Sequence, residues 1–296
     1  MSTIHPSIQK YLNQFFSEKL NLPNSWPEFR SVGGGSINDT YQLFINNQAR
    51  FFLKINSADK YPRLLEKEKN GLEFLASQKI AHTPQVIVCD TIDKHQILVL
   101  EWIEKGLQIE RFWGRFGEQL AALHHVTNSY FGFQEDNYMG ALPQRNRHYN
   151  SWIEFFVHCR LQPQIELATI KHLLHEKLVT AFEHLYEELE NIFNDEQPSL
   201  LHGDLWSGNF MCNHESEPVL IDPAIYFGHR SMDLAMTTLF GGFERSFYES
   251  YNYHFPFPGN YTEQWDICNL YPLLIHLNLF GEGYLPQIER ILQVYM

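Results

Sequence analysis

The spacing of apolar residues divides the chain into a short region that contains strands and a longer region that is mainly helical. Near the start, Ile4, Ile8 and Leu12 recur at helical intervals and predict an amphipathic helix that ends before Pro23. Shorter apolar runs follow. They predict strands at 40–45, 51–55, 85–89 and 96–100, with a helix at 64–75. The first hundred residues therefore combine a small sheet with helices.

Beyond residue 106, stretches with helical periodicity predominate. The predicted helices cover 109–126, 152–159, 165–193, 232–243 and 262–280. Between the two regions, Glu101-Trp102-Ile103-Glu104-Lys105-Gly106 interrupts the pattern and predicts a hinge. We expect an α+β fold with two lobes, residues 1–102 forming the smaller N-terminal lobe and 103–296 the larger helical lobe. The 296 residues, 44% of them hydrophobic, suffice for two such cores.

The strongest chemical signal is a polar segment that begins at His202-Gly203-Asp204. Asn209 follows Asp204 by five residues, and Asp222 follows after thirteen more. Between them, two short apolar runs flank a polar turn at 213–218, which predicts a hairpin that brings Asn209 and Asp222 together. Carboxylate and amide oxygens are ligands that suit Mg²⁺.

Protein kinases use the same order and the same Asp-to-Asn spacing for phosphoryl transfer. On that basis we predict Asp204 as the catalytic residue and Asn209 and Asp222 as metal ligands. An aspartate with an ordinary pKa of about 3.9 is a weak base for an alcohol. Asp204 is therefore expected to orient the hydroxyl and to accept its proton late. An isolated Asp and Asn at this spacing more often form an ordinary turn, so the neighbouring features matter.

A glycine-rich segment precedes the strand predicted at 40–45. It reads Gly33-Gly34-Gly35-Ser36, and backbone N–H groups in such a turn can approach phosphate oxygens closely. Three glycines also form flexible loops, and the spacing matches neither the protein-kinase loop nor a P-loop. Together with Glu101, whose backbone at the hinge could bind an adenine edge, the segment is a candidate site for ATP.

Lys54 lies in an apolar strand, where an inward-facing lysine would need a partner. The helix predicted at 64–75 carries Glu66 and Glu68. In protein kinases a strand lysine pairs with a helix glutamate and holds the α- and β-phosphates. We expect Glu68 to be the partner, with Glu66 as the alternative. The ordinary alternative for Lys54 itself is an edge-strand lysine that faces solvent.

Charge and cysteine usage narrow the class of protein. The chain has 22 Lys and Arg against 35 Asp and Glu, a net charge of −13, which disfavours binding to DNA or RNA but tolerates a cationic substrate. The four cysteines are far apart and form no Cys-x-x-Cys pair, which indicates reduced thiols and a cytoplasmic protein. We found no apolar stretch long enough to span a membrane.

The run 201–209, Leu-His-Gly-Asp-Leu-Trp-Ser-Gly-Asn, resembles the fructosamine-3-kinase (ketosamine-3-kinase) family, as do 222–224 and 226–230. That family belongs to the aminoglycoside-phosphotransferase-like group, which as a whole shares only the His-Gly-Asp, the Asn and the later Asp. The Leu-Trp-Ser-Gly insert at 205–208 narrows the resemblance from this wider group to the fructosamine-3-kinase family. Further stretches similar to the family extend from about residue 30 to 284.

The resemblance implies that ATP and Mg²⁺ are used to phosphorylate the 3-hydroxyl of a ketosamine, the adduct of a sugar and an amine. The product of that family is unstable and frees the amine, which amounts to deglycation. By position, Lys54 and Glu68 would be the nucleotide-binding ion pair, Asp204 the base, and Trp206 a stacking surface for the substrate. Further residues on the substrate side would be Arg160, His276 and Asn278. The glycine-rich segment has no cysteine, so the redox control of some relatives is not expected.

Two alternatives remain open at this point. A related kinase acting on an aminoglycoside, choline or homoserine would keep the phosphate-handling residues and differ around Trp206. A catalytically silent nucleotide-binding protein would be expected to lack at least one of Lys54, Asp204, Asn209 and Asp222, and all four are present. The preferred ketosamine and the oligomeric state are not determined by the sequence.

Overall fold

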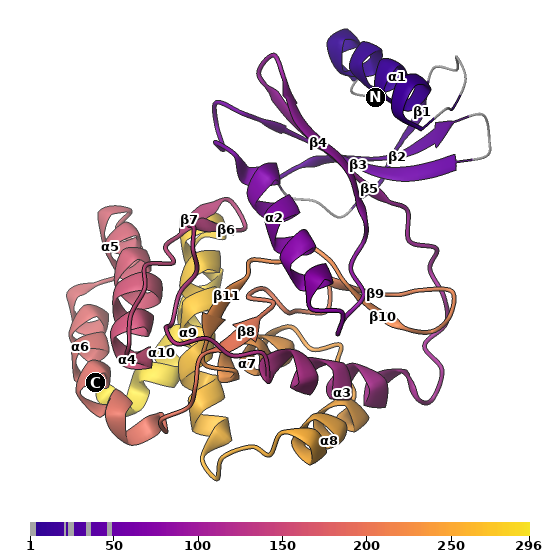
Figure 1. The fold of residues 1–296 in the computed structure, drawn as a ribbon. Helices are drawn as coiled ribbons and strands as arrows, with labels where there is room; N and C mark the ends of the chain where they lie inside the picture. The colour runs from indigo at the N-terminus through magenta and orange to yellow at the C-terminus, as the bar shows by residue number, and fades with distance from the viewer. Residues whose placement is uncertain (1–3, 21, 23–26, 34–36, 46–48) are drawn as a thin grey trace. The chain divides into compact units, whose positions relative to one another are not determined.

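The computed structural model describes residues 4–20, 22, 27–33, 37–45 and 49–296, which fold into two compact units (Figure 1). The first unit comprises the chain up to Ser77 together with Thr83–Lys105, and the second comprises Gln78–His82 and Gly106–Met296. The first unit thus extends three residues beyond the expected boundary at 102. The short segment Gln78–His82 packs with the helical unit, where the carbonyl of His82 accepts the N–H of Leu220 at 2.8 Å.

A five-stranded antiparallel sheet forms the centre of the first unit. Its strands, in spatial order, are β1 (Glu28–Ser31), β2 (Asp39–Ile45), β3 (Ala49–Ser57), β5 (His95–Glu101) and β4 (Val86–Ile92). The apolar runs predicted β2 to β5 correctly. The edge strand β1 was not predicted, because Glu-Phe-Arg-Ser is short and has one apolar residue.

Alternation along β3 sends neighbouring side chains to opposite faces of the sheet. Leu53 and Ile55 join a buried cluster with the apolar side of α1 (Pro6–Lys19), the predicted N-terminal helix. The other face is covered by α2 (Leu64–Ser77) (Figure 1). Gln96 of β5 fixes the start of α2, because its side-chain oxygen accepts the N–H of Leu65 at 3.2 Å. The sheet therefore has one apolar face and one face that also carries polar side chains.

The second unit is built mainly from helices. They are α3 (Phe112–His124), α4 (Trp152–Phe155), α5 (Gln162–Ile170), α6 (Glu176–Ile192), α7 (Ser231–Leu239), α8 (Arg245–His254), α9 (Tyr261–Phe280) and α10 (Leu285–Leu292). The long helix α9 is buried on most of its surface, as expected for a helix that is apolar on nearly every side. Helices α3 and α8 pack closely, and the absence of a side chain at Gly117 allows this. A Cβ there would lie 2.2 Å from the carbonyl oxygen of Phe247.

Several helix boundaries differ from the predicted ones. The single helix expected at 165–193 is two helices, α5 and α6, because the chain turns at His172, whose φ is 58°. The helix expected at 232–243 ends at Leu239, since Gly241 and Gly242 adopt positive φ angles. The segment at 152–159 is α4 followed by a π-helix, Phe156–Leu161. The polar helix α8 and the short α10 were not predicted.

Three two-stranded sheets complete the second unit. They pair β6 (Asn137–Met139) with β7 (Leu142–Gln144), β8 (Ser199–Leu201) with β11 (Tyr226–Gly228), and β9 (Phe210–Cys212) with β10 (Pro218–Leu220). The β9–β10 pair is the predicted hairpin, with Met211 opposite Val219. Among the described helices, none is long and apolar enough to cross a membrane. The strands matter for function because they position the loop 202–209 between β8 and β9.

Candidate active site

The loop 202–209 is held in shape by hydrogen bonds among its own residues. The side-chain amide of Asn209 donates to the backbone oxygen and to Oδ2 of Asp204, both at 2.9 Å. The N–H of Trp206 donates to the Asp204 carbonyl at 3.2 Å, and the N–H of Asn209 to the Trp206 carbonyl at 2.9 Å. The Asp204 carboxylate is therefore fixed at the tip of a tight loop that also presents Trp206.

His202 connects this loop to the segment before Asp222. Its Nε2–H donates to the carbonyl of Ile221 at 2.9 Å, and its Nδ1 accepts the N–H of Asp204 at 3.3 Å. Both ring nitrogens thus have the partners of a neutral imidazole. Burial also lowers the pKa of His202. A neutral histidine therefore holds the two carboxylate-bearing segments in one arrangement.

Asp222 lies in a strained turn directly after the hairpin. Its φ of 53° places it in the left-handed region, which is uncommon for a residue other than glycine. Gly203 also has a positive φ, and a Cβ there would lie 2.1 Å from the Ala224 carbonyl oxygen. The N–H of Ala224 donates to the His202 carbonyl at 2.9 Å. The loop 202–209 and the Asp222 turn are thus in direct backbone contact.

The side chains of Asn209 and Asp222 fit a divalent cation that prefers oxygen ligands. The N–H of Ile221 donates to the Asn209 carbonyl at 3.0 Å, which places Asn209 beside the residue that precedes Asp222, as the predicted hairpin requires. Because the Asn209 amide nitrogen donates to Asp204, the amide oxygen is the atom that can ligate a cation. An amide and a carboxylate oxygen suit Mg²⁺ better than zinc, which favours nitrogen and sulfur.

The pKa of Asp204 differs from the ordinary value assumed for the sequence. Burial raises this pKa most and the nearby negative charge of Asp222 raises it too, while the hydrogen bond from Asn209 lowers it, and together they bring the pKa to about 7. The expectation of an ordinary aspartate pKa was therefore wrong, because the loop removes this carboxylate from much of its water. Its pKa lies in the range where a side chain acts efficiently as a general base.

Asp233 binds the backbone of the loop 202–209 and was not singled out from the sequence. This buried residue in the first turn of α7 accepts the N–H of His202 at 2.7 Å and that of Gly203 at 2.9 Å. Its Oδ2 also accepts Nε2–H of His124 at 3.2 Å, and His124 Nδ1 lies 2.8 Å from the Tyr251 hydroxyl. Asp233 lies 29 residues after Asp204, and no local motif links the two.

A second buried network fixes the backbone after Asp222. The Gln144 side-chain amide donates to the Ala224 carbonyl at 3.0 Å and to Oδ1 of Asn137 at 2.8 Å. Asn137 in turn donates to the carbonyl of Ile225 at 2.9 Å. The hydroxyl of Tyr271, on α9, donates to Gln144 Oε1 at 2.9 Å. The β6–β7 pair therefore holds the strained Asp222 turn in place.

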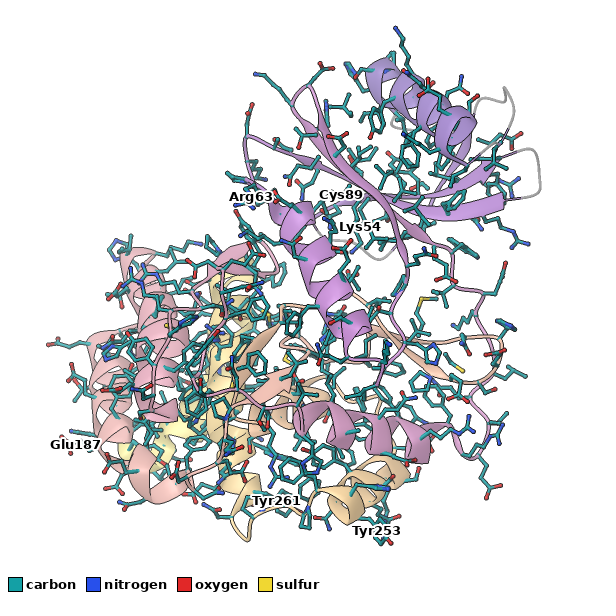
Figure 2. All side chains as sticks on the ribbon, viewed as in Figure 1. Lys54, Arg63, Cys89, Glu187, Tyr253 and Tyr261 are labelled. Atoms are coloured by element: carbon teal, nitrogen blue, oxygen red, sulfur yellow. The ribbon has the colours of Figure 1, made fainter. Side chains whose placement is uncertain are left out.

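In the first unit, Lys54 and Glu68 form a buried ion pair with 2.7 Å between Nζ and Oε1. Figure 2 labels Lys54 on the sheet beside α2. Glu66 instead binds Arg63, with two hydrogen bonds of 2.6 Å that lower the pKa of Glu66. The structure thus decides between the two glutamates in favour of Glu68.

The other residues expected near the nucleotide are only partly described. Gly33 is exposed, whereas Gly34, Gly35 and Ser36 lie outside the described residues. The backbone N–H of Glu101 donates to the Gln85 carbonyl at 2.8 Å, and the Glu101 carboxylate accepts the N–H of Gln85 at 3.2 Å. Because that N–H is engaged within the unit, a contact between Glu101 and adenine would have to use its carbonyl.

The four residues expected on the substrate side divide into two groups. Trp206 and His276 lie in contact with the same ring, that of Phe240. Arg160 is fully buried and Asn278 nearly so. Arg160 donates to Oδ1 of Asn146 at 2.8 Å and stacks on the ring of Tyr226, and Asn278 donates to the Gln164 carbonyl at 2.9 Å. These contacts give Arg160 and Asn278 structural roles, so we do not assign them to the substrate.

Comparison with known proteins identifies the family of this chain. The family model described as fructosamine kinase matches residues 8–296. The chain belongs to the fructosamine kinase family. A probable ketoamine kinase of Synechocystis is 38% identical over 293 residues, which cover 97% of each chain. A chloroplastic protein-ribulosamine 3-kinase of Arabidopsis thaliana is 34% identical over 90% of this chain and 82% of its own.

Solved structures give the same result for the fold. The crystal structure of a putative fructosamine-3-kinase from Thermobifida fusca superposes with a TM-score of 0.84 at 28% identity, and covers 96% of this chain and 98% of its own. The α+β, two-lobed kinase-like fold predicted from the sequence is thereby confirmed.

Two buried histidines predict how the stability of this fructosamine kinase depends on pH. Burial lowers the pKa of His229 to about 4 and also lowers that of His124. The unfolded chain takes up these protons near pH 6.5, whereas the folded protein resists them. His229 should therefore lower the free energy of unfolding by about 2 kcal/mol between pH 7 and pH 5, and His124 acts in the same direction, whereas the raised pKa of Asp204 acts in the opposite direction.

Urea unfolding at pH 7 and pH 5 measures this effect. His229→Gln should reduce the difference between the two pH values, because one proton uptake is removed. His214→Gln, at an exposed position, should leave the difference unchanged. A change in stability between the two pH values that is the same in His229→Gln as in the wild type would contradict the prediction.

Proposed function

We propose that this protein transfers the γ-phosphate of ATP to the 3-hydroxyl of ketosamines, such as fructosamine or ribulosamine adducts of amines. The observation that carries the proposal is the loop 202–209, in which hydrogen bonds bring Asp204 and Asn209 together beside Trp206 and next to the segment that carries Asp222. The relatives named as ketoamine and ribulosamine kinases match this chain over most of its length.

Phosphoryl transfer requires positioning and charge neutralisation more than covalent chemistry. Asp204 accepts a hydrogen bond from the 3-hydroxyl, orients it towards the γ-phosphate and takes its proton. Lys54, held by Glu68, binds oxygens of the α- and β-phosphates. The amide oxygen of Asn209 and the carboxylate of Asp222 would hold Mg²⁺, which would supply positive charge to the phosphates.

The preference for ketosamines over other alcohols rests on the family and on Trp206. A sugar presents an apolar face of C–H groups, and an aromatic ring beside Asp204 offers a surface for it to stack on. Phosphorylation at the 3-position then gives the unstable product described for the family, which breaks down and frees the amine. The consequence would be repair of glycated amines.

A substrate panel tests the proposal. Purified protein with ATP and Mg²⁺ is offered the fructosamine and the ribulosamine of lysine, and separately free lysine, an aminoglycoside, choline and homoserine, while ADP release is recorded. We expect ADP release with the ketosamines, at least a hundredfold faster than with the other compounds, and none after chelation of Mg²⁺. Phosphorus NMR of the product should show a 3-phosphate. Preferred phosphorylation of the aminoglycoside, choline or homoserine would favour the alternative kinase and contradict the proposal.

A further inference from the structure

A row of aromatic rings begins at the catalytic loop and continues across the second unit. Ring centroids lie 5.8 Å apart for Trp206 and Phe240, 5.0 Å for Phe240 and His276, and 5.5 Å for His276 and Phe280. Tyr284 lies 5.0 Å from His276 and 6.3 Å from Phe280. We call these five residues the aromatic row.

The aromatic row remains accessible to solvent although it is largely apolar. Trp206 is 36% exposed, Phe240 40% and Phe280 58%. Contiguous exposed apolar surface is uncommon on soluble proteins and marks sites of binding. The row starts two residues after Asp204, so it continues directly from the site of phosphoryl transfer.

Two glycines allow the contact between Trp206 and Phe240, the first two residues of the row. A Cβ at Gly208 would lie 2.3 Å from the Trp206 ring, so the indole rests directly on the backbone of its own loop. Gly242 has a φ of 91°, and a Cβ there would lie 2.6 Å from Cβ of Ser207. The loop that carries Phe240 is therefore pressed against the catalytic loop, which fixes Phe240 beside Trp206.

His276 adds one polar group to this apolar surface. Its Nδ1–H donates to the carbonyl of Pro272 at 2.7 Å, so in the neutral ring Nε2 is an acceptor. Burial lowers the pKa of His276 and favours the neutral form. The row therefore offers ring faces and a neutral acceptor, a combination that suits an alkylammonium group followed by an apolar chain.

We propose that the aromatic row binds the amine half of the substrate, with the ammonium nitrogen between Trp206 and His276 and the chain of the amine extending to Phe280 and Tyr284. This inference rests on the proposed function, because it assumes that the sugar half lies at Asp204 and Trp206. With the sugar there, the later rings are left for the rest of the molecule. The enzyme should then prefer ketosamines of long or aromatic amines over those of short amines.

The test compares two substrates in three variants. The fructosamines of hexylamine and of methylamine share the sugar and the nitrogen and differ only in the apolar chain. The ratio of their kcat/KM values should favour the hexylamine adduct in the wild type. It should fall about tenfold in Phe280→Ala and in Tyr284→Ala through a higher KM for the hexylamine adduct, because the chain loses an aromatic contact. Phe280 is more than half exposed at the end of α9, so its removal should preserve the fold.

Tyr253→Ala is the matched control. This aromatic residue, labelled on α8 in Figure 2, is 83% exposed and contacts the ring of His254, which is not part of the aromatic row. It should leave the substrate ratio at the wild-type value. An unchanged ratio in both row variants, or an equal fall in Tyr253→Ala, would overturn the role of the row while the proposed function stands. Failure of the wild type to phosphorylate the fructosamines and the ribulosamines of both amines would overturn both.

Discussion

Asp204→Asn is expected to lower kcat by about 10²–10⁴-fold, the range typical for the loss of a positioned general base. Asparagine keeps the size of the side chain and its carbonyl oxygen, but it cannot accept the proton of the substrate hydroxyl. The affinity for ATP should remain within about twofold, since the nucleotide-binding residues are unchanged. Steady-state ADP release gives kcat, and isothermal titration gives the dissociation constant for ATP.

A surface aspartate supplies the control for this substitution. Asp195 is exposed in the segment before β8, and Asp195→Asn should leave both kcat and ATP affinity unchanged. Turnover by Asp204→Asn within a factor of two of the wild type would remove Asp204 from the mechanism. A large loss of ATP affinity, in contrast, would indicate that the loop itself had been disturbed.

Lys54→Ala is expected to weaken ATP binding and to lower turnover by at least a hundredfold, because an ammonium group is lost from the phosphates. It also leaves the buried Glu68 carboxylate without its 2.7 Å ion-pair partner. Removing one member of a buried pair destabilises a protein by about 3–5 kcal/mol. Urea unfolding measures this loss, and titration with ATP measures the change in affinity.

Two further variants separate the loss of the fold from the loss of the nucleotide site. Lys69→Ala removes a lysine of α2 that pairs with Glu73 at 3.5 Å near the surface, and it should change stability by less than about 0.5 kcal/mol. The double variant Lys54→Met, Glu68→Gln removes both buried charges and should regain much of the stability without regaining ATP affinity. Wild-type ATP affinity and turnover in Lys54→Ala would refute the assigned role.

Features that depend on residues close in sequence could be predicted. The hairpin between Asn209 and Asp222 follows from two apolar runs and a polar turn, and it forms as expected. The position of Lys54 on the face opposite Leu53 follows from alternation along one strand. Which glutamate it meets depends on the rotation of α2 over the sheet, which places Glu68 inward and leaves Glu66 to Arg63.

Features that depend on tertiary contacts could not be predicted. Asp233 meets the loop because α7 packs beneath it, and nothing in its local sequence distinguishes it from a capping aspartate. The family resemblance suggested that Arg160 binds the substrate. Its buried guanidinium group instead stacks on Tyr226 and donates a hydrogen bond to Asn146. The turn at His172 requires a left-handed backbone that an apolar pattern cannot reveal.

The contacts of Asp233 have a consequence for inherited or engineered variation in this enzyme. Because this carboxylate joins the backbone of His202 and Gly203 to His124 of α3 and, through it, to Tyr251 of α8, the loop shares its anchorage with the helical core. We therefore expect the loop to lose its structure together with the helical core. A substitution buried between α3 and α8, far from any substrate, should therefore lower activity. A screen that measures activity alone would not distinguish such a substitution from one in the active site.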